Sequence, residues 1–126
     1  MKVICGYCGK SALFVDSSVI YGISYGMIYY CADCKAWVGV HKGTDKPLGS
    51  LANEELRKQR KIAHAVLDRM WRDNRKMTRK QTYQWLSHKM GLTTEETHIG
   101  LFDMEQCRQV IEICRKNQED KRNVQE

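Results

Sequence analysis

The chain has 126 residues and a formal net charge of +6 at pH 7, which fits one domain or a small metal-bound module joined to a modest helical core, and excludes a large enzyme. Its first ten residues, MKVICGYCGK, lack the apolar core of a secretory signal, and no segment approaches the length of a membrane span. These features predict a cytoplasmic protein without a membrane partner, and in a reducing compartment paired cysteines indicate metal binding before disulfides.

The first 48 residues consist of short segments rich in Val, Ile, Tyr and Gly, separated by breaks that contain Gly and Ser. Such segments are typical of short β-strands and turns. The segments that we predict as strands are ALFVDS, SVIYGIS, GMIYYC and AWVGVH.

Two Cys-x-x-Cys pairs stand out in this region: Cys5 with Cys8, and Cys31 with Cys34. Two intervening residues let both sulfurs of a pair reach about 2.3 Å from one tetrahedral zinc ion. The 22 residues between the pairs leave room for the two central strands of a zinc ribbon. We therefore predict one structural Zn²⁺ held by all four cysteines, with a redox dithiol, a cluster site or unligated cysteines as the alternatives.

Beyond Leu48 the apolar residues recur with helical spacing, and we expect three helices. The first begins at Asn53, whose side chain can cap free backbone N–H groups. The second starts at Thr78, where Gln81 completes a capping box, and it stops at Gly91.

The third helix starts after Asp103, with Gln106 in the capping-box position, and runs to about Lys116 before a polar tail. We interpret Cys107 and Cys114 as small core residues and not as a second metal or redox pair, because they lie two helical turns apart on its inner face. The inward-facing residues of the three helices are predicted to be Leu56, Ala63, Val66, Leu67 and Met70; Tyr83, Leu86 and Met90; and Cys107, Val110, Ile111 and Cys114.

These patterns predict an α+β protein with an N-terminal four-cysteine zinc ribbon, a long basic helix and a small helical C-terminal subdomain. The expected organisation is a zinc ribbon over 1–48, a helical region over 49–118 packed on the ribbon, and a flexible tail over 119–126.

Positive charge is concentrated in the middle of the chain. Residues 51–90 carry eleven Lys/Arg against four Asp/Glu, whereas 1–50 carry five against three and 91–126 carry five against eight. A basic helix beside a zinc ribbon suits the phosphates of DNA or RNA, although solvated helices carry such charges too. The predicted phosphate-binding residues are Lys42, Lys46, Arg57, Lys58, Arg60, Lys61, Arg69, Arg72, Arg75 and Lys76, followed by Arg79 and Lys80. The aromatic residues that could stack on bases if exposed are Tyr25, Tyr29, Tyr30 and Trp37.

Several stretches resemble a known family. The two cysteine pairs and the segments VGVHKGT, PLGSLANEELR, AHAVLD and HIGLFD resemble the zinc-finger-containing domain family found in bacteriophage and prophage genomes, from Cys5 to about Cys114. The resemblance implies a phage or mobile-element protein with a zinc site, acting in the bacterial cytoplasm. It implies no reaction.

Two other function classes stay open beside nucleic-acid binding. One is a protein-interaction module that docks on a host enzyme or defence component. The other is an HNH-like nuclease, because His41 after a strand, Asn53 in a loop and His64 on a helix follow the order of that site. Both cysteine pairs precede His41, however, and Asn53 is already assigned as a helix cap, so we favour binding without catalysis. His98 is interpreted as a turn-stabilising residue.

Overall fold

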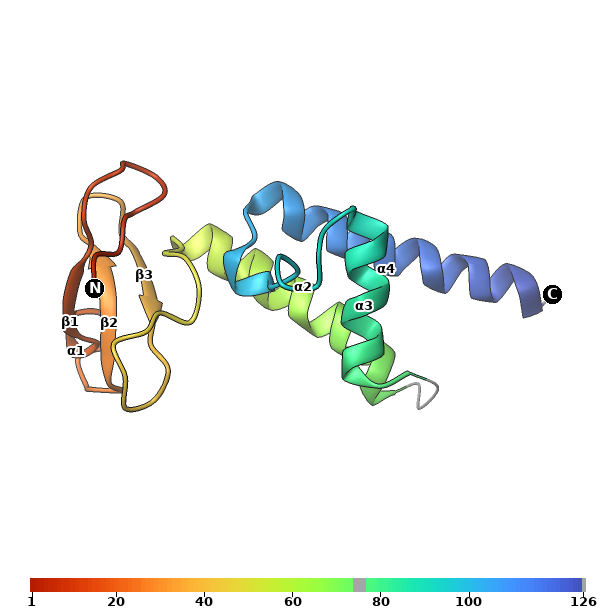
Figure 1. Cartoon of the computed structure of the whole chain (residues 1–126), viewed down its shortest axis with the longest axis horizontal. Coiled ribbons are helices and arrows are strands. Elements are labelled where there is room, and N and C mark those ends of the chain that lie inside the picture. Colours follow the sequence, from red (N-terminus) through yellow and green to blue (C-terminus); the bar gives the residue numbers. More distant parts are fainter. Residues whose placement is uncertain (74–76, 126) are drawn as a thin grey trace. The chain divides into compact units, whose positions relative to one another are not determined.

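The computed structural model describes residues 1–73 and 77–125, which form a small sheet and several helices (Figure 1). The chain folds as two compact units, Met1–Arg57 and Lys58–Glu126, here termed unit 1 and unit 2. This mixture of helix and sheet agrees with the predicted α+β class, while the division into 1–48, 49–118 and 119–126 stays a prediction. Within the described ranges, no helix is both long and apolar enough to cross a bilayer.

Unit 1 contains an antiparallel sheet of three strands in the order β1 (Leu13–Asp16), β2 (Met27–Cys31) and β3 (Ala36–Gly39). Three of the four predicted strand segments are therefore confirmed. A further antiparallel bridge between Ile4 and Ser11 closes a hairpin around the first cysteine pair. The sheet thus brings two hairpin turns, one for each cysteine pair, into the same unit.

The segment SVIYGIS is not a strand, so that prediction is wrong. It contains a one-turn helix, α1 (Ser18–Tyr21), which ends at Gly22 in the left-handed conformation with φ of 77°. Asp16 holds the turn together, because its carboxylate accepts hydrogen bonds from the Ser18 N–H and from the Ser24 hydroxyl, both at 2.8 Å. These local side-chain bonds compete with strand pairing and override the apolar pattern.

The two faces of the sheet have different roles. The strand register pairs Phe14 with Tyr29 and Tyr29 with Val38, so these side chains share one face. That face holds the core of unit 1, whose buried residues are Cys5, Tyr29, Cys31, Ala36, Val38 and Leu51. Side chains shifted by one position point to the opposite face, as Ile28 and Trp37 do.

After β3 the chain turns back and pairs with the strand that it has just left. Gly39 accepts a hydrogen bond from the Leu48 N–H at 2.9 Å, and Trp37 exchanges two backbone hydrogen bonds of 3.1 Å with Ala52. The 41–46 loop between these segments is therefore anchored at both ends.

Helix α2 (Glu54–Arg72) begins at the predicted cap, because the Asn53 Oδ1 accepts a hydrogen bond from the Leu56 N–H at 2.9 Å. The predicted inward-facing stripe is largely confirmed, since Val66 is half-buried and the buried members are Leu56, Ala63, Leu67 and Met70.

Helix α3 (Arg79–Met90) has the predicted capping box. Thr78 Oγ1 accepts from the Gln81 N–H at 3.1 Å, and Gln81 Oε1 accepts from the Thr78 N–H at 2.9 Å. Gly91 ends the helix in the left-handed conformation, as expected. Leu86 is fully buried, whereas the other two predicted inward-facing residues, Tyr83 and Met90, are half-buried.

Helix α4 (Met104–Gln125) starts with the second predicted box, in which Asp103 and Gln106 exchange hydrogen bonds of 2.8 and 3.1 Å. A short 3-10 helix, η1 (Ile99–Leu101), precedes it and was not predicted. The predicted helix end near Lys116 is wrong, because α4 continues to Gln125. The sequence after Lys116 is polar, but it contains no Pro or Gly that would interrupt helical hydrogen bonds.

We expect Thr78→Ala to lower the free energy of unfolding of unit 2 by about 1 kcal/mol, because the substitution leaves a backbone N–H at the start of α3 without its acceptor. Thr78→Ser keeps the hydroxyl and serves as the matched control. Chemical denaturation followed by helical circular dichroism measures both. Equal stability of the Ala and Ser variants would contradict the proposed contribution of the cap.

Candidate metal centre

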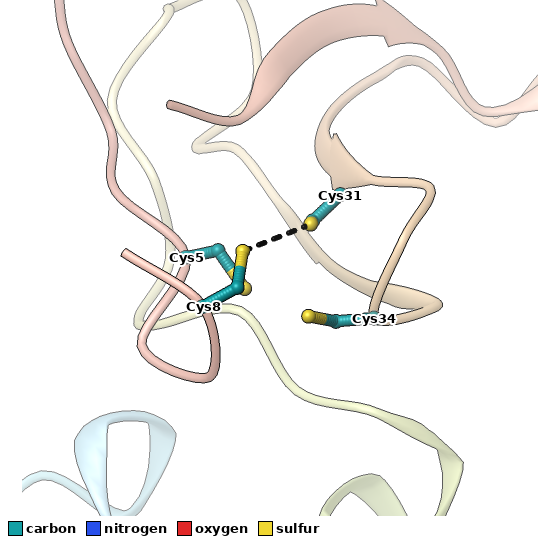
Figure 2. Close-up of side chains that lie close together, drawn as sticks. All are labelled: Cys5, Cys8, Cys31 and Cys34. Carbon is teal, nitrogen blue, oxygen red and sulfur yellow. Dashed lines mark hydrogen bonds between the residues drawn. The ribbon is translucent and has the colours of Figure 1, made fainter. Parts of the chain in front are cut away.

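The four N-terminal cysteines converge on one point in unit 1 (Figure 2). All four sulfur atoms lie within 4.8 Å of one another, and the Sγ atoms of Cys8 and Cys31 are 3.7 Å apart. A tetrahedron whose corners lie about 2.3 Å from its centre has edges of roughly 3.8 Å, so this spacing fits four sulfurs around one metal ion. Within the described residues, this is the one group of three or more His, Cys, Asp or Glu side chains placed to hold a metal.

The first cysteine pair lies in a tight turn of the backbone. The Cys5 carbonyl accepts a hydrogen bond from the Gly9 N–H at 2.8 Å, and the Cys5 N–H donates to the Lys10 carbonyl at 2.9 Å. Gly9 has a φ of 77°, a left-handed conformation that glycine adopts without strain. This turn directs the N–H groups of Tyr7 and Cys8 toward the Cys5 sulfur, where they favour a thiolate.

The second pair lies in the turn between β2 and β3. Lys35 adopts a positive φ of 51° and donates its N–H to the Ala32 carbonyl at 3.4 Å, which closes the turn. The Cys34 N–H donates to the sulfur of Cys31, as the corresponding groups do in the first turn. The two turns therefore use similar backbone chemistry around their thiols.

One ion pair connects the two turns. Lys10 Nζ lies 2.9 Å from Asp33 Oδ2, and both side chains are mostly exposed. The Asp33 carboxylate raises the pKa of Lys10, and the nearby sulfurs of Cys8 and Cys31 add to this effect. The ammonium group thus lies where it can offset part of the charge of a four-thiolate site.

Burial makes the four thiol groups chemically unequal. It raises the pKa of Cys34 to about 12, together with the neighbouring thiols of Cys8, Cys31 and Cys5. Burial also disfavours the Cys5 thiolate, but the N–H donors of Tyr7 and Cys8, together with the thiols of Cys31 and Cys34, outweigh it and lower the pKa of Cys5. A metal ion must therefore displace at least the Cys34 proton at neutral pH.

The remaining two cysteines lie in unit 2. Cys107 and Cys114 are buried on α4, and burial raises the pKa of both thiols, to about 11 for Cys114. These protonated side chains act as small apolar core residues, as the helical spacing predicted.

The histidines have separate surroundings. The backbone of His41 closes the 41–46 loop, since its N–H donates to the Lys46 carbonyl at 2.9 Å and its carbonyl accepts from the Thr44 hydroxyl at 2.8 Å. His64 is half-buried on α2 in unit 2, where burial lowers its pKa. Asn53 is occupied as the cap of α2. The order that suggests an HNH site therefore gains no support from these contacts.

The structure separates the predicted phosphate-binding residues into two groups. The first group already makes contacts within the fold: Arg57 Nη1 donates to the Trp37 carbonyl at 3.0 Å, and Arg60 Nε donates to the Phe102 carbonyl at 2.9 Å. The second group is exposed, although Lys58, Arg72 and Arg79 also make contacts within the fold. It consists of Lys42, Lys46, Lys58, Lys61, Arg69, Arg72, Arg79 and Lys80. Arg75 and Lys76 lie outside the described residues.

Only some of the predicted stacking residues can reach a ligand. Tyr25 is 72% exposed, whereas Tyr29 is 3% exposed and donates its hydroxyl to the Asp45 carbonyl at 2.7 Å. Tyr30 and Trp37 are half-buried. Tyr21, which is 48% exposed, was not among the predicted stacking residues, because its segment resembles a strand.

We expect unit 1 to bind one equivalent of a thiophilic divalent ion such as Zn²⁺, and Cys31→Ser to lose the ion and the folded sheet, because three thiolates do not complete the tetrahedron. The matched control is Cys114→Ala, which removes a thiol outside the cluster. Metal content by mass spectrometry and the fluorescence of the tryptophans report the two effects. Loss of metal from the control variant as well would contradict the assignment of the four ligands.

We expect the affinity for Zn²⁺ to rise with pH between 6 and 8. The Cys34 thiol has a pKa of about 12 and is therefore protonated throughout this range. Because zinc binding releases its proton, the association constant rises about tenfold per pH unit for each proton released. Competition with a chromophoric chelator measures the affinity, and calorimetry in buffers of different ionisation enthalpy counts the protons. An affinity that is constant over this pH range would contradict thiolate ligation.

The comparisons with known proteins agree with this centre. A model of the family described as zinc-finger-containing domain matches residues 1–117, which is most of the chain. Searches of curated proteins and of solved structures found no match. With a matching family model and four cysteines placed to hold one metal ion, the chain belongs to the family of zinc-finger-containing domains.

Proposed function

We propose that this protein is a zinc-ribbon accessory protein that binds DNA or RNA mainly through phosphates and with little dependence on base sequence. Cys5, Cys8, Cys31 and Cys34 hold one Zn²⁺, which stabilises unit 1 and takes no part in a reaction, because four thiolates leave no coordination position for water. A bacteriophage or other mobile element as its source, and the bacterial cytoplasm as its location, belong to the same proposal.

Sulfur spacing supports zinc as the metal. The 3.7 Å between Cys8 and Cys31 is close to the edge of a zinc–thiolate tetrahedron, and each cysteine pair lies in a turn whose N–H groups point at sulfur. Zinc in such a site contributes on the order of 10 kcal/mol to folding. A contribution of this size is large for a unit of fewer than 60 residues.

A row of exposed residues on one face of α2 carries the nucleic-acid part of the proposal. Its members follow one another at intervals of three or four positions, and all are exposed: Lys58, Lys61, Ala65, Arg69 and Arg72. We term this set the basic row. It spans roughly 21 Å at 1.5 Å per residue, and the small Ala65 at its centre leaves room for a backbone to approach.

Two members of the basic row, Lys58 and Arg72, also interact within the fold. Arg72 Nη2 lies 3.9 Å from Asp68 Oδ2. Solvent screens this ion pair, because the guanidinium is exposed. Lys61 and Arg69 are exposed on the same face. Such a row can neutralise several phosphates at once but offers no fixed hydrogen-bond pattern to base edges, so binding depends on charge and not on sequence.

A protein-interaction module is the second candidate, and one observation favours it. β1 is an edge strand, and exposed apolar side chains extend from it into the segment that follows, namely Leu13, Phe14, Val19 and Ile23. A partner strand could pair along this edge. Leu13→Lys should abolish capture of a protein partner from nuclease-treated host lysate and leave nucleic-acid binding unchanged.

We expect the affinity for a DNA duplex to fall steeply with salt, with a slope of log K against log salt of about −0.9 for each phosphate contacted. The double variant Lys61→Gln/Arg69→Gln should reduce the slope by about 2. The matched control, Lys89→Gln/Lys116→Gln, removes two exposed charges from α3 and α4 and should change the slope much less. Fluorescence anisotropy across a salt series measures both.

Two results would contradict the proposal. One is an absence of binding to duplex and single-stranded probes at low salt. The other is an equal loss of slope in both double variants, which would mean that the basic row has no special part in binding.

A further inference from the structure

The sheet face opposite the cysteines contains a hollow of about 700 Å³ in unit 1. Ile28, Trp37 and Gly39 form its floor, since they alternate with the core residues of β2 and β3. The connection between β1 and β2 lines one side, and Lys42 to Thr44 of the anchored 41–46 loop line another. The hollow is lined by none of the four cysteines and by no residue of the basic row.

Three aromatic rings lie together in this hollow. Tyr21 packs edge to face against both Tyr25, at 5.5 Å between ring centroids, and Trp37, at 6.3 Å. The Trp37 Nε1–H donates to the Tyr21 hydroxyl at 3.2 Å, which holds the cluster together. Tyr25 is nevertheless 72% exposed, so most of its ring remains accessible to a ligand.

Positive charge accompanies these rings. The Arg57 guanidinium lies 4.2 Å from the centroid of the Trp37 ring and donates to the Trp37 carbonyl, which fixes its position. Lys42, in the 41–46 loop, also lines the hollow and is exposed. No carboxylate belongs to the described residues that line the hollow. A cationic ligand is therefore disfavoured, and a flat ring attached to an anion is favoured.

We propose that this hollow binds unpaired bases of a single-stranded nucleic acid, with Tyr25 as the stacking surface and with Lys42 and Arg57 beside the sugar-phosphate chain. The inference rests on the proposed nucleic-acid binding and adds to it a preference for strands whose bases are free. Every base has a flat face for stacking, so the contact tolerates sequence, while paired bases in a duplex cannot enter the hollow.

The test uses the zinc-loaded full chain and fluorescence anisotropy at one fixed salt concentration. The probes are an oligothymidine strand, an oligouridine strand, an abasic strand with the same number of phosphates, and a duplex of the same length. The variants are Tyr25→Leu, which removes the ring, Tyr25→Phe, which keeps it, and Phe14→Leu. Phe14 is a matched control because it is exposed on the other face of the sheet, where it packs against Tyr29. Zinc content must equal that of the unmodified protein in every variant.

We expect the base-containing strands to bind roughly tenfold tighter than the abasic strand, because one stacked base contributes a factor of about 5 to 150. Tyr25→Leu should lose this advantage, whereas Tyr25→Phe and Phe14→Leu should keep it, and duplex binding should be the same in all variants. A larger advantage for one of the two base-containing strands would identify DNA or RNA as the natural ligand.

Equal affinity for strands with and without bases, or equal behaviour of Tyr25→Leu and Phe14→Leu, would overturn the inference. Continued salt-dependent binding of the duplex would then leave the proposed function intact, and the hollow would belong to another ligand such as a peptide. The opposite result is that single strands bind only when they carry bases and only when Tyr25 is present, while the duplex and the abasic strand do not bind at all. This result would support base binding in the hollow and contradict the phosphate-dominated function.

Discussion

Unit 1 depends on bringing four thiol groups from two distant turns to within a few ångströms of one another. Its buried core is small, and two of the six residues in it are the cysteines Cys5 and Cys31. A core of this size provides little hydrophobic stabilisation, so a domain of this length usually needs a metal ion or disulfides. Bound metal would turn the costly burial of protonated thiols into a set of strong bonds that link both turns to the sheet.

The same short strands connect this centre to the opposite surface. Because successive side chains point to opposite faces, β3 buries Ala36 and Val38 on the cysteine side while Trp37 lies in the aromatic hollow. A change in register by one residue would exchange the two faces. The cysteine cluster and the hollow therefore depend on the same strand register, although none of the four cysteines lines the hollow.

Unit 2 uses a different source of order. Reciprocal hydrogen bonds between side chains and backbone define where α3 and α4 begin, and an apolar core that includes Leu67, Leu86 and Phe102 holds the helices together. This arrangement also divides the arginines of α2. Arg60 faces inward and bonds the Phe102 carbonyl, while the exposed side of the helix carries the basic row.

The sequence alone determined the four converging cysteines, the caps at Asn53, Thr78 and Asp103, and most of the buried helical stripes. Each of these rests on a short-range rule of spacing or capping that holds wherever the segment lies. Tertiary structure decided which arginines bond to backbone carbonyls of the fold, that Tyr29 is buried while Tyr25 is exposed, and that Tyr21, Tyr25 and Trp37 meet. The exposure and the contacts of a side chain depend on which segments from elsewhere in the chain pack against it, and the local sequence pattern does not specify those segments.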